Sequence, residues 1–134
     1  MDGSSSSGRS KGFEAAWLKP TATTSERVRG LLAVGLTRSD IVKAIGVAER
    51  TFSNWKSGRS NPHADAASAF DDLRFAAMTL VEGGVSPERV GRWLLSRNSQ
   101  HLDGQRPVDL IQSSPQAVIS AAQAEVSDTA PHVR

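Results

Sequence analysis

The sequence contains no cysteine, which excludes disulfide bonds and any metal site or iron–sulfur cluster held by thiolates. It also has no apolar run close to the roughly 18 residues that a membrane-spanning helix requires. The Ser/Gly-rich stretch that opens the chain has no apolar segment behind its charges, unlike a secretory signal. These absences predict a soluble, cytoplasmic protein with no membrane partner.

Residues suited to catalysis or metal binding are scarce as well. His63, His101 and His132 are scattered, and none has a second ligand at metal-binding spacing. Gly83 and Gly84 form an isolated pair at the end of a predicted helix, not a phosphate-binding loop. We therefore expect no enzymatic activity, no cofactor and no metal site.

The charges are distributed unevenly, although the formal net charge is only +2. Residues 25–62 carry seven cations and three anions, a balance of +4. Residues 63–134 carry six cations and nine anions, a balance of −3. A basic segment joined to an acidic one is typical of a DNA-binding domain followed by a segment that binds a partner other than DNA.

Apolar residues recur at helical spacing, and no segment alternates with the period of two that marks a strand, so the predicted fold class is all-α. Thr24 or Ser25 is expected to cap the first main helix. Thr37 is expected to cap the second, because Asp40 follows it by three residues. The pair Ser86-Pro87 also predicts the start of a helix, because serine caps helices and proline is favoured as the first helical residue. Helices are predicted over 27–36, 37–46, 49–56 and 62–82, from 86 to a loop at 98–106, and over 107–111 and 115–125.

Large apolar side chains define the expected core. Trp17, Trp55 and Trp93 each lie in an apolar run and are expected to anchor it. Phe75 is expected on the apolar face of the 62–82 helix. Composition and turn signals predict five segments: a flexible N-terminal arm (1–24), a helix-turn-helix DNA-binding domain (25–62), a connecting helix (63–84), a small helical C-terminal domain (85–125) and a disordered tail (126–134).

Residues 37–62 read TRSDIVKAIGVAERTFSNWKSGRSNP and predict two short helices that meet at a sharp turn. Gly46 permits the turn, because glycine tolerates the left-handed backbone conformation. Apolar residues are expected to pack the wedge between the helices, and polar residues of the second helix are left facing outward. The wedge residues are Ile41, Ile45, Val47, Phe52 and Trp55.

This stretch resembles the helix-turn-helix of Xre-type repressors, with Gly46, Val47, Thr51, Phe52, Ser53, Trp55, Gly58 and Pro62 in register. The serine usual after Gly-Val in that family is Ala48 here. The resemblance implies that Glu49, Arg50 and Asn54 read base edges in double-stranded DNA. The expected contacts to the DNA backbone are Arg38, Thr51, Ser53, Lys56 and Arg59.

Residues 93–111, WLLSRNSQHLDGQRPVDLI, resemble the C-terminal domain of the Xre/MbcA/ParS group. In that group the domain binds a RES-type toxin and the antitoxin represses its own operon. Arg97 and Ser99 stand where the group usually has prolines. The candidate partner-binding residues are Arg97, Asn98 and Arg106.

Three functional interpretations follow. The first is a sequence-specific transcriptional repressor, such as a phage immunity repressor, acting at the nucleoid or in the host cytoplasm. The alternative is an antitoxin of the Xre/MbcA/ParS type that binds a RES-type toxin and represses its own operon. The third is an adaptor whose helix-turn-helix no longer binds DNA. In each case the C-terminal domain is expected to hold a protein partner or to self-associate.

Overall fold

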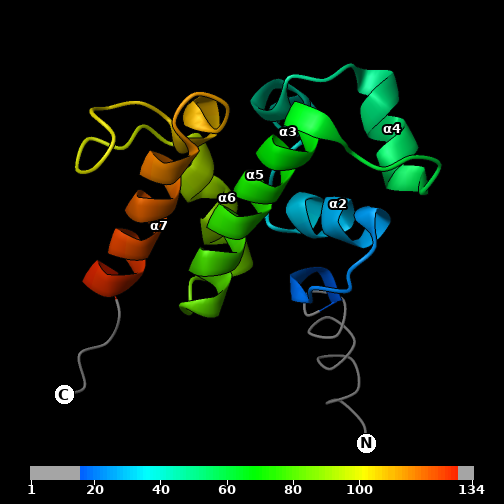
Figure 1. Cartoon of the computed structure of the whole chain (residues 1–134). Helices are drawn as coiled ribbons and strands as arrows, with labels where there is room; N and C mark the ends of the chain where they lie inside the picture. Colours follow the sequence, from blue (N-terminus) through cyan, green and yellow to red (C-terminus); the bar gives the residue numbers. More distant parts are fainter. Residues whose placement is uncertain (1–15, 130–134) are drawn as a thin grey trace, which may run out of the picture.

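The computed structural model describes residues 16–129, and every regular element in that range is a helix (Figure 1). Residues 16–18 form a helical turn, and an isolated bridge joins Asn98 to Gln105. The all-α prediction is confirmed. The elements are α2 (Thr24–Ala33), α3 (Arg38–Ile45), α4 (Glu49–Ser57), α5 (Ala64–Glu82), α6 (Pro87–Leu95), the 3-10 helix η1 (Pro107–Leu110) and α7 (Pro115–Thr129).

Local capping explains where the first two of these helices begin. The Thr37 hydroxyl accepts from the Asp40 N–H over 3.1 Å, and the Asp40 carboxylate accepts from the Thr37 N–H over 2.9 Å, as predicted. The predicted start of α2 is wrong, because Thr23 is its cap. Thr23 forms the same reciprocal pair with Glu26, at 3.1 and 2.8 Å. A glutamate three residues on distinguishes Thr23 from Thr24 and Ser25.

Two later boundaries also bear on the predictions. Ser86 is the N-cap residue of α6 and Pro87 its first helical residue, as predicted. Helix α7 continues to Thr129, beyond the predicted end at Glu125. Val126 is half-buried and packs against Gly83 at the end of α5, so residues 126–129 belong to the helix and not to a disordered tail. Residues 1–15 and 130–134, which include most of the predicted arm and the rest of the tail, lie outside the described range.

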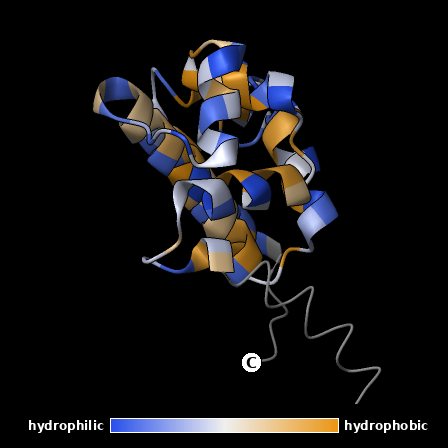
Figure 2. Cartoon of the chain, turned by 90° about the vertical axis from the view of Figure 1, so that its right-hand side faces the viewer, coloured by the Kyte–Doolittle hydropathy of each residue, from blue (hydrophilic) through white to orange (hydrophobic). Residues whose placement is uncertain are grey.

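Helix α5 lies at the centre of the molecule and contacts the elements on both sides of it. Figure 1 shows α2, α3 and α4 on one side and α6 and α7 on the other. Figure 2 shows hydrophilic and hydrophobic residues interspersed along the helices, and the buried residues are all apolar or glycine, with no buried polar or charged residue in the described range. The buried stripe of α5 consists of Ala69, Phe70, Leu73, Ala76, Ala77 and Leu80.

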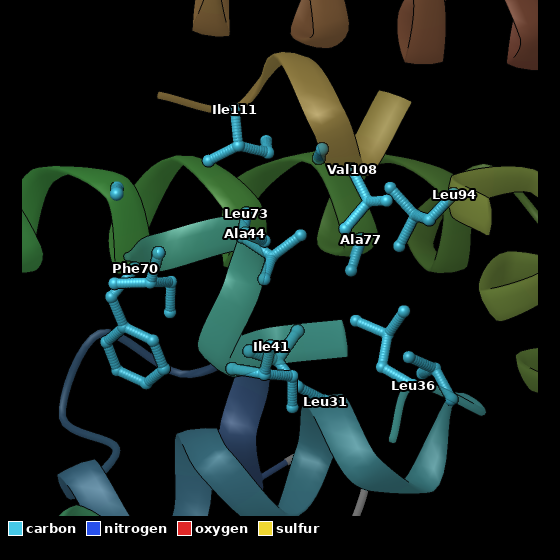
Figure 3. Packing of buried hydrophobic residues seen from close by; sticks show 14 of the residues in the cluster. Leu31, Leu36, Ile41, Ala44, Phe70, Leu73, Ala77, Leu94, Val108 and Ile111 are labelled. Atoms are coloured by element: carbon cyan, nitrogen blue, oxygen red, sulfur yellow. The ribbon is translucent and has the colours of Figure 1, made fainter. Parts of the chain in front are cut away.

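One cluster of buried side chains extends from Trp17 to Ala122. Figure 3 shows Leu31 and Ile41 from one side of α5 and Val108 and Ile111 from the other, with α5 residues between them. The cluster crosses the predicted segment boundaries after residues 62 and 84. The division into separate domains stays a prediction.

Two expected core residues are placed differently. Trp17 and Trp55 are buried, as predicted, but Phe75 is 45% exposed and Trp93 is only half-buried. Phe75 is two residues from Leu73, about 200° around the helix, and therefore points away from the buried stripe. Within the described range no helix has the length and apolar character to cross a membrane, and no three potential metal-ligating side chains converge.

Candidate functional site

The turn between α3 and α4 determines how these two helices meet. Gly46 ends α3 in the left-handed conformation, with φ of 81°, and its N–H donates to the Val42 carbonyl over 2.8 Å. Any side chain would be strained at this φ, and a Cβ there would lie 2.9 Å from the Gln112 amide oxygen. The predicted glycine stop is confirmed, and the residue that covers the turn comes from the segment after η1.

Buried aromatic side chains fix the rotation of α4 about its own axis. Phe52 and Trp55 are 0% and 2% exposed. The Trp55 ring centroid lies 5.5 Å from that of Phe70 on α5, with the ring planes tilted by 41°. Next to Trp55, near the C-terminal end of α4, the Lys56 carbonyl accepts from the Ser25 hydroxyl of α2 over 2.7 Å. The opposite face of α4 is therefore held toward the outside.

That outer face carries a stripe of polar residues. Because a helix advances about 100° per residue, Arg50, Ser53, Asn54 and Ser57 lie opposite the buried aromatic pair. Arg50 and Ser57 are exposed, whereas Ser53 and Asn54 are half-buried. Arg50, Ser53 and Asn54 were predicted from the sequence to contact DNA, whereas Ser57 was not. Its distance of seven residues, or two turns, from Arg50 was a signal that could have found it.

Glu49 and Thr51 flank this stripe on opposite sides. Glu49 is exposed and faces α3. Thr51 and Asn54 border a hollow of about 280 Å³ that the loop at residues 60–63 completes. The structure therefore places two of the predicted base readers, Arg50 and Asn54, on the outer stripe of α4, with Asn54 partly turned toward the loop, and the third, Glu49, on the flank that faces α3.

Arg38 is the first residue of α3, and its guanidinium contacts three residues of α4. Its Nη1 donates to the Ser53 hydroxyl over 2.9 Å and lies 3.5 Å from the Glu49 carboxylate. Its central carbon lies 5.2 Å from the centroid of the Phe52 ring, within cation–π range. Arg38 and Ser53, both predicted to contact the DNA backbone, thus form one group together with Glu49.

Lys56 and Arg59 lie at and beyond the C-terminal end of α4. Gly58, with φ of 82°, ends the helix, and the Arg59 N–H donates to the Asn54 carbonyl over 2.8 Å. Arg59 is exposed, and Lys56 is half-buried beside Arg29 of α2. Neither cation belongs to the outer stripe of α4.

Asn98 organises the loop that joins α6 to η1. Its N–H donates to the Gln105 carbonyl over 3.0 Å, and its side-chain oxygen accepts from the His101 N–H over 2.9 Å. Arg97 donates to the Gly104 carbonyl across the same loop over 3.2 Å. The predicted loop is confirmed, and hydrogen bonds among its own residues hold it closed.

Arg106 is held by the 3-10 helix that follows this loop. Its Nε and Nη2 donate to the two carboxylate oxygens of Asp109 over 2.9 and 2.8 Å. This paired hydrogen bond lowers the pKa of Asp109 and raises the pKa of Arg106. Two of the guanidinium's five N–H donors are therefore used inside the chain.

A second hollow, of about 290 Å³, lies between α6, the loop and α7. Half-buried Trp93 forms part of its wall, and Glu125 of α7 closes the far side. Arg97 and Asn98 line it, but Arg106 does not. The structure thus brings two of the three predicted partner-binding residues together around Trp93.

Comparison with known proteins identifies the family. No protein-family model matches the chain. The probable mycobacterial cidal antitoxin Rv3188 of Mycobacterium tuberculosis is 35% identical over 98 residues, which cover 72% of this chain and 81% of that protein. A chain of the M. tuberculosis MbcT–MbcA toxin–antitoxin complex matches with a TM-score of 0.65 at 20% identity, covering 78% of this chain and 95% of that one.

The chain belongs to the family of MbcA-type antitoxins. The resemblance to the Xre/MbcA/ParS group is thereby confirmed. The 35% identity to a protein named as an antitoxin favours the antitoxin alternative over the first interpretation, a phage immunity repressor.

Proposed function

We propose that this protein is an antitoxin that binds and neutralises a toxin protein. The observation that carries the proposal is the 35% identity, over 81% of its length, to a protein named as an antitoxin. The shared fold with a chain of a toxin–antitoxin complex supports it. A toxin of the RES type is the partner that the family resemblance implies.

The surface proposed for the toxin is the hollow around Trp93. It combines a half-buried tryptophan with Arg97 and Asn98, and aromatic and arginine side chains contribute strongly to protein interfaces. The hydrogen bonds that close the 98–106 loop make this surface pre-formed, which lowers the entropic cost of association.

Growth rescue and co-purification test this function together. We expect the chain, co-expressed with a RES-type toxin encoded beside its gene, to restore growth and to co-purify with that toxin. Trp93→Ala should weaken both effects, whereas Arg89→Ala, an exposed substitution on the same helix, should leave them unchanged. Failure of the unmodified chain to rescue growth and to bind the toxin would contradict the proposal.

A second function, sequence-specific DNA binding through α4, is favoured by a different observation. Arg50 and Asn54 lie on the outer stripe of a helix whose rotation is fixed by buried aromatic residues, and exposed Glu49 lies on the flank beside it. An excess of four positive charges over residues 25–62 would add attraction to phosphates. Repression of the protein's own operon is the regulatory role that this binding would serve.

Selection from random duplex DNA tests the second function. We expect the purified chain to enrich a defined sequence and to bind it more weakly as salt concentration rises, because binding releases counterions from the phosphates. Equal affinity for selected and scrambled duplexes would contradict sequence-specific binding.

A further inference from the structure

Arg38 connects the start of α3 to the flank of α4 that carries Glu49, one of the three proposed base readers. Its three contacts, Glu49, Phe52 and Ser53, are spaced i, i+3 and i+4, so they form one column on the surface of α4. A guanidinium is flat and has several N–H donors in a fixed arrangement. One arginine can therefore lie on the Phe52 ring, bond to Ser53 and neutralise Glu49 at the same time.

The charge of Glu49 gives this arrangement a role at a DNA surface. A carboxylate near phosphates is repelled, yet its oxygens can accept a hydrogen bond from the cytosine amino group. Arg38 Nη1 lies 3.5 Å away and offsets part of this negative charge, in a pair whose side chains are 42% and 63% exposed. It also keeps the carboxylate on the side of α4 that faces α3.

We propose that Arg38 is a positioning residue for base recognition, which holds the Glu49 carboxylate where it reads one base pair with a preference for cytosine. The inference rests on the proposed DNA binding by α4. Arg38 would then set the sequence preference at a base pair that it does not itself touch.

The same contacts have a simpler possible role, which predicts a different result. Ala48 at the start of α4 makes no side-chain capping bond, so Arg38 would serve only to fasten the first turn of α4 to α3. If Arg38 only fastens α4 to α3, Arg38→Ala should lower the melting temperature and reduce the affinity for every DNA sequence by the same factor. Positioning predicts a changed preference at one base pair.

The experiment measures binding to the sequence enriched from random duplex DNA and to all its single-base variants. We expect the unmodified chain to discriminate roughly 5- to 150-fold at the base pair read by Glu49. Glu49→Ala should abolish that preference. Arg38→Ala should reduce the preference at this base pair to within about threefold of that measured for Glu49→Ala. In the double variant, Arg38→Ala should cause no further change in preference, because Glu49 is already alanine.

Two further variants act as controls. Arg38→Lys keeps the charge but lacks the planar group, so it should retain most of the affinity and lose the preference. Arg89→Ala removes one exposed cation from α6 and should leave the preference unchanged.

Three results would overturn the proposed role of Arg38. An Arg38→Ala variant that keeps the full preference, with or without a lower melting temperature, overturns the positioning role and leaves DNA binding intact. An unchanged preference in Glu49→Ala overturns it as well. If the unmodified chain enriches no sequence, the proposed DNA binding fails and the inference fails with it.

Discussion

Arg50 and Lys56 lie on the same helix but have different surroundings. Arg50 is exposed on the outer stripe of α4, whereas Lys56 is half-buried near α2 at the end of the helix. An arginine on the stripe can form two hydrogen bonds with a guanine, and a cation at the end of the helix is suited to phosphates.

Substitution should therefore separate these two kinds of contact. Arg50→Ala should cost about 1–3 kcal/mol on the selected sequence and relax preference at one position. Lys56→Ala or Arg59→Ala should weaken binding to all sequences alike and lower the salt slope by about one. Titrations on selected and scrambled DNA at several salt concentrations measure both. An equal loss for Arg50→Ala on the two DNAs would make Arg50 a phosphate contact.

Asp72 on α5 provides a prediction about pH. Burial, and secondarily the neighbouring Asp71, raise the pKa of the Asp72 carboxyl. Its ionisation is therefore less favourable in the folded chain, so its contribution to stability is greatest below the unfolded pKa of about 3.9 and declines as pH rises through the higher folded pKa.

We accordingly expect Asp72→Asn to be slightly more stable than the unmodified chain at pH 7, by about 0.5 kcal/mol or less. The difference should vanish near pH 3, where Asp72 is protonated in both states. Asp65→Asn is the contrast, since Asp65 lies in the first turn of the same helix, where the helix dipole favours a carboxylate, and its loss should lower stability at pH 7. Denaturant unfolding at the two pH values measures these effects. If Asp72→Asn were less stable than the unmodified chain at pH 7, the inference that ionised Asp72 lowers the stability of the fold would be wrong.

At the scale of helices and loops, the sequence predicted most directly what nearby residues control. Each of the three correct predictions, the Thr37–Asp40 capping box, the end of α3 at Gly46 and the start of α6 at Ser86-Pro87, depends on residues that are neighbours in the sequence. Two wrong predictions, the cap of α2 and the placement of Phe75, also concern local features, the Thr23–Glu26 pair and helical spacing from Leu73. The wrong end of α7 has a different cause, a contact distant in sequence. Val126 extends α7 because it packs against Gly83, a partner 43 positions away.

Trp17 and Gly30 form another contact that the sequence does not reveal. A Cβ at Gly30 would lie 2.1 Å from Cγ of the buried Trp17. Alanine in place of glycine usually stabilises a helix by about 1 kcal/mol. Here the indole occupies the space that the methyl group needs.

Gly30→Ala should therefore destabilise the protein, by about 1–3 kcal/mol, as other overpacked sites do. The penalty should shrink or reverse when Trp17 is replaced by leucine, because the smaller side chain can move away. Thermal unfolding of the two single variants and the double variant measures the coupling. A Gly30→Ala variant as stable as the unmodified chain would show that Trp17 shifts freely.

At the scale of the whole molecule, the candidate site was only partly predictable. Helical spacing alone placed Arg50 and Asn54 on the outer side of α4. The pairing of Arg38 with Glu49 depends on how α3 crosses α4, and the position of Trp93 at a surface hollow depends on α7, which lies far along the chain. Neither arrangement leaves a periodic pattern in the sequence.

Leu73 tests whether the molecule unfolds as one unit. It is completely buried in α5, between the elements on its two sides. Leu73→Ala should cost about 2–5 kcal/mol. Because one cluster spans both sides, hydrogen exchange should show the same loss of protection in α3 and in α7. Loss on one side alone would favour two independently folding units.

The shared core also has a consequence for the lifetime of the protein in a cell. If both sides of α5 unfold together, the helices from α2 to α7 are exposed to proteases together or not at all. A ligand that binds the folded form at one end lowers the population of the open form throughout the chain. Occupancy at either surface would then slow degradation of the entire molecule, so that the amount of antitoxin present follows the amount of partner available to hold it.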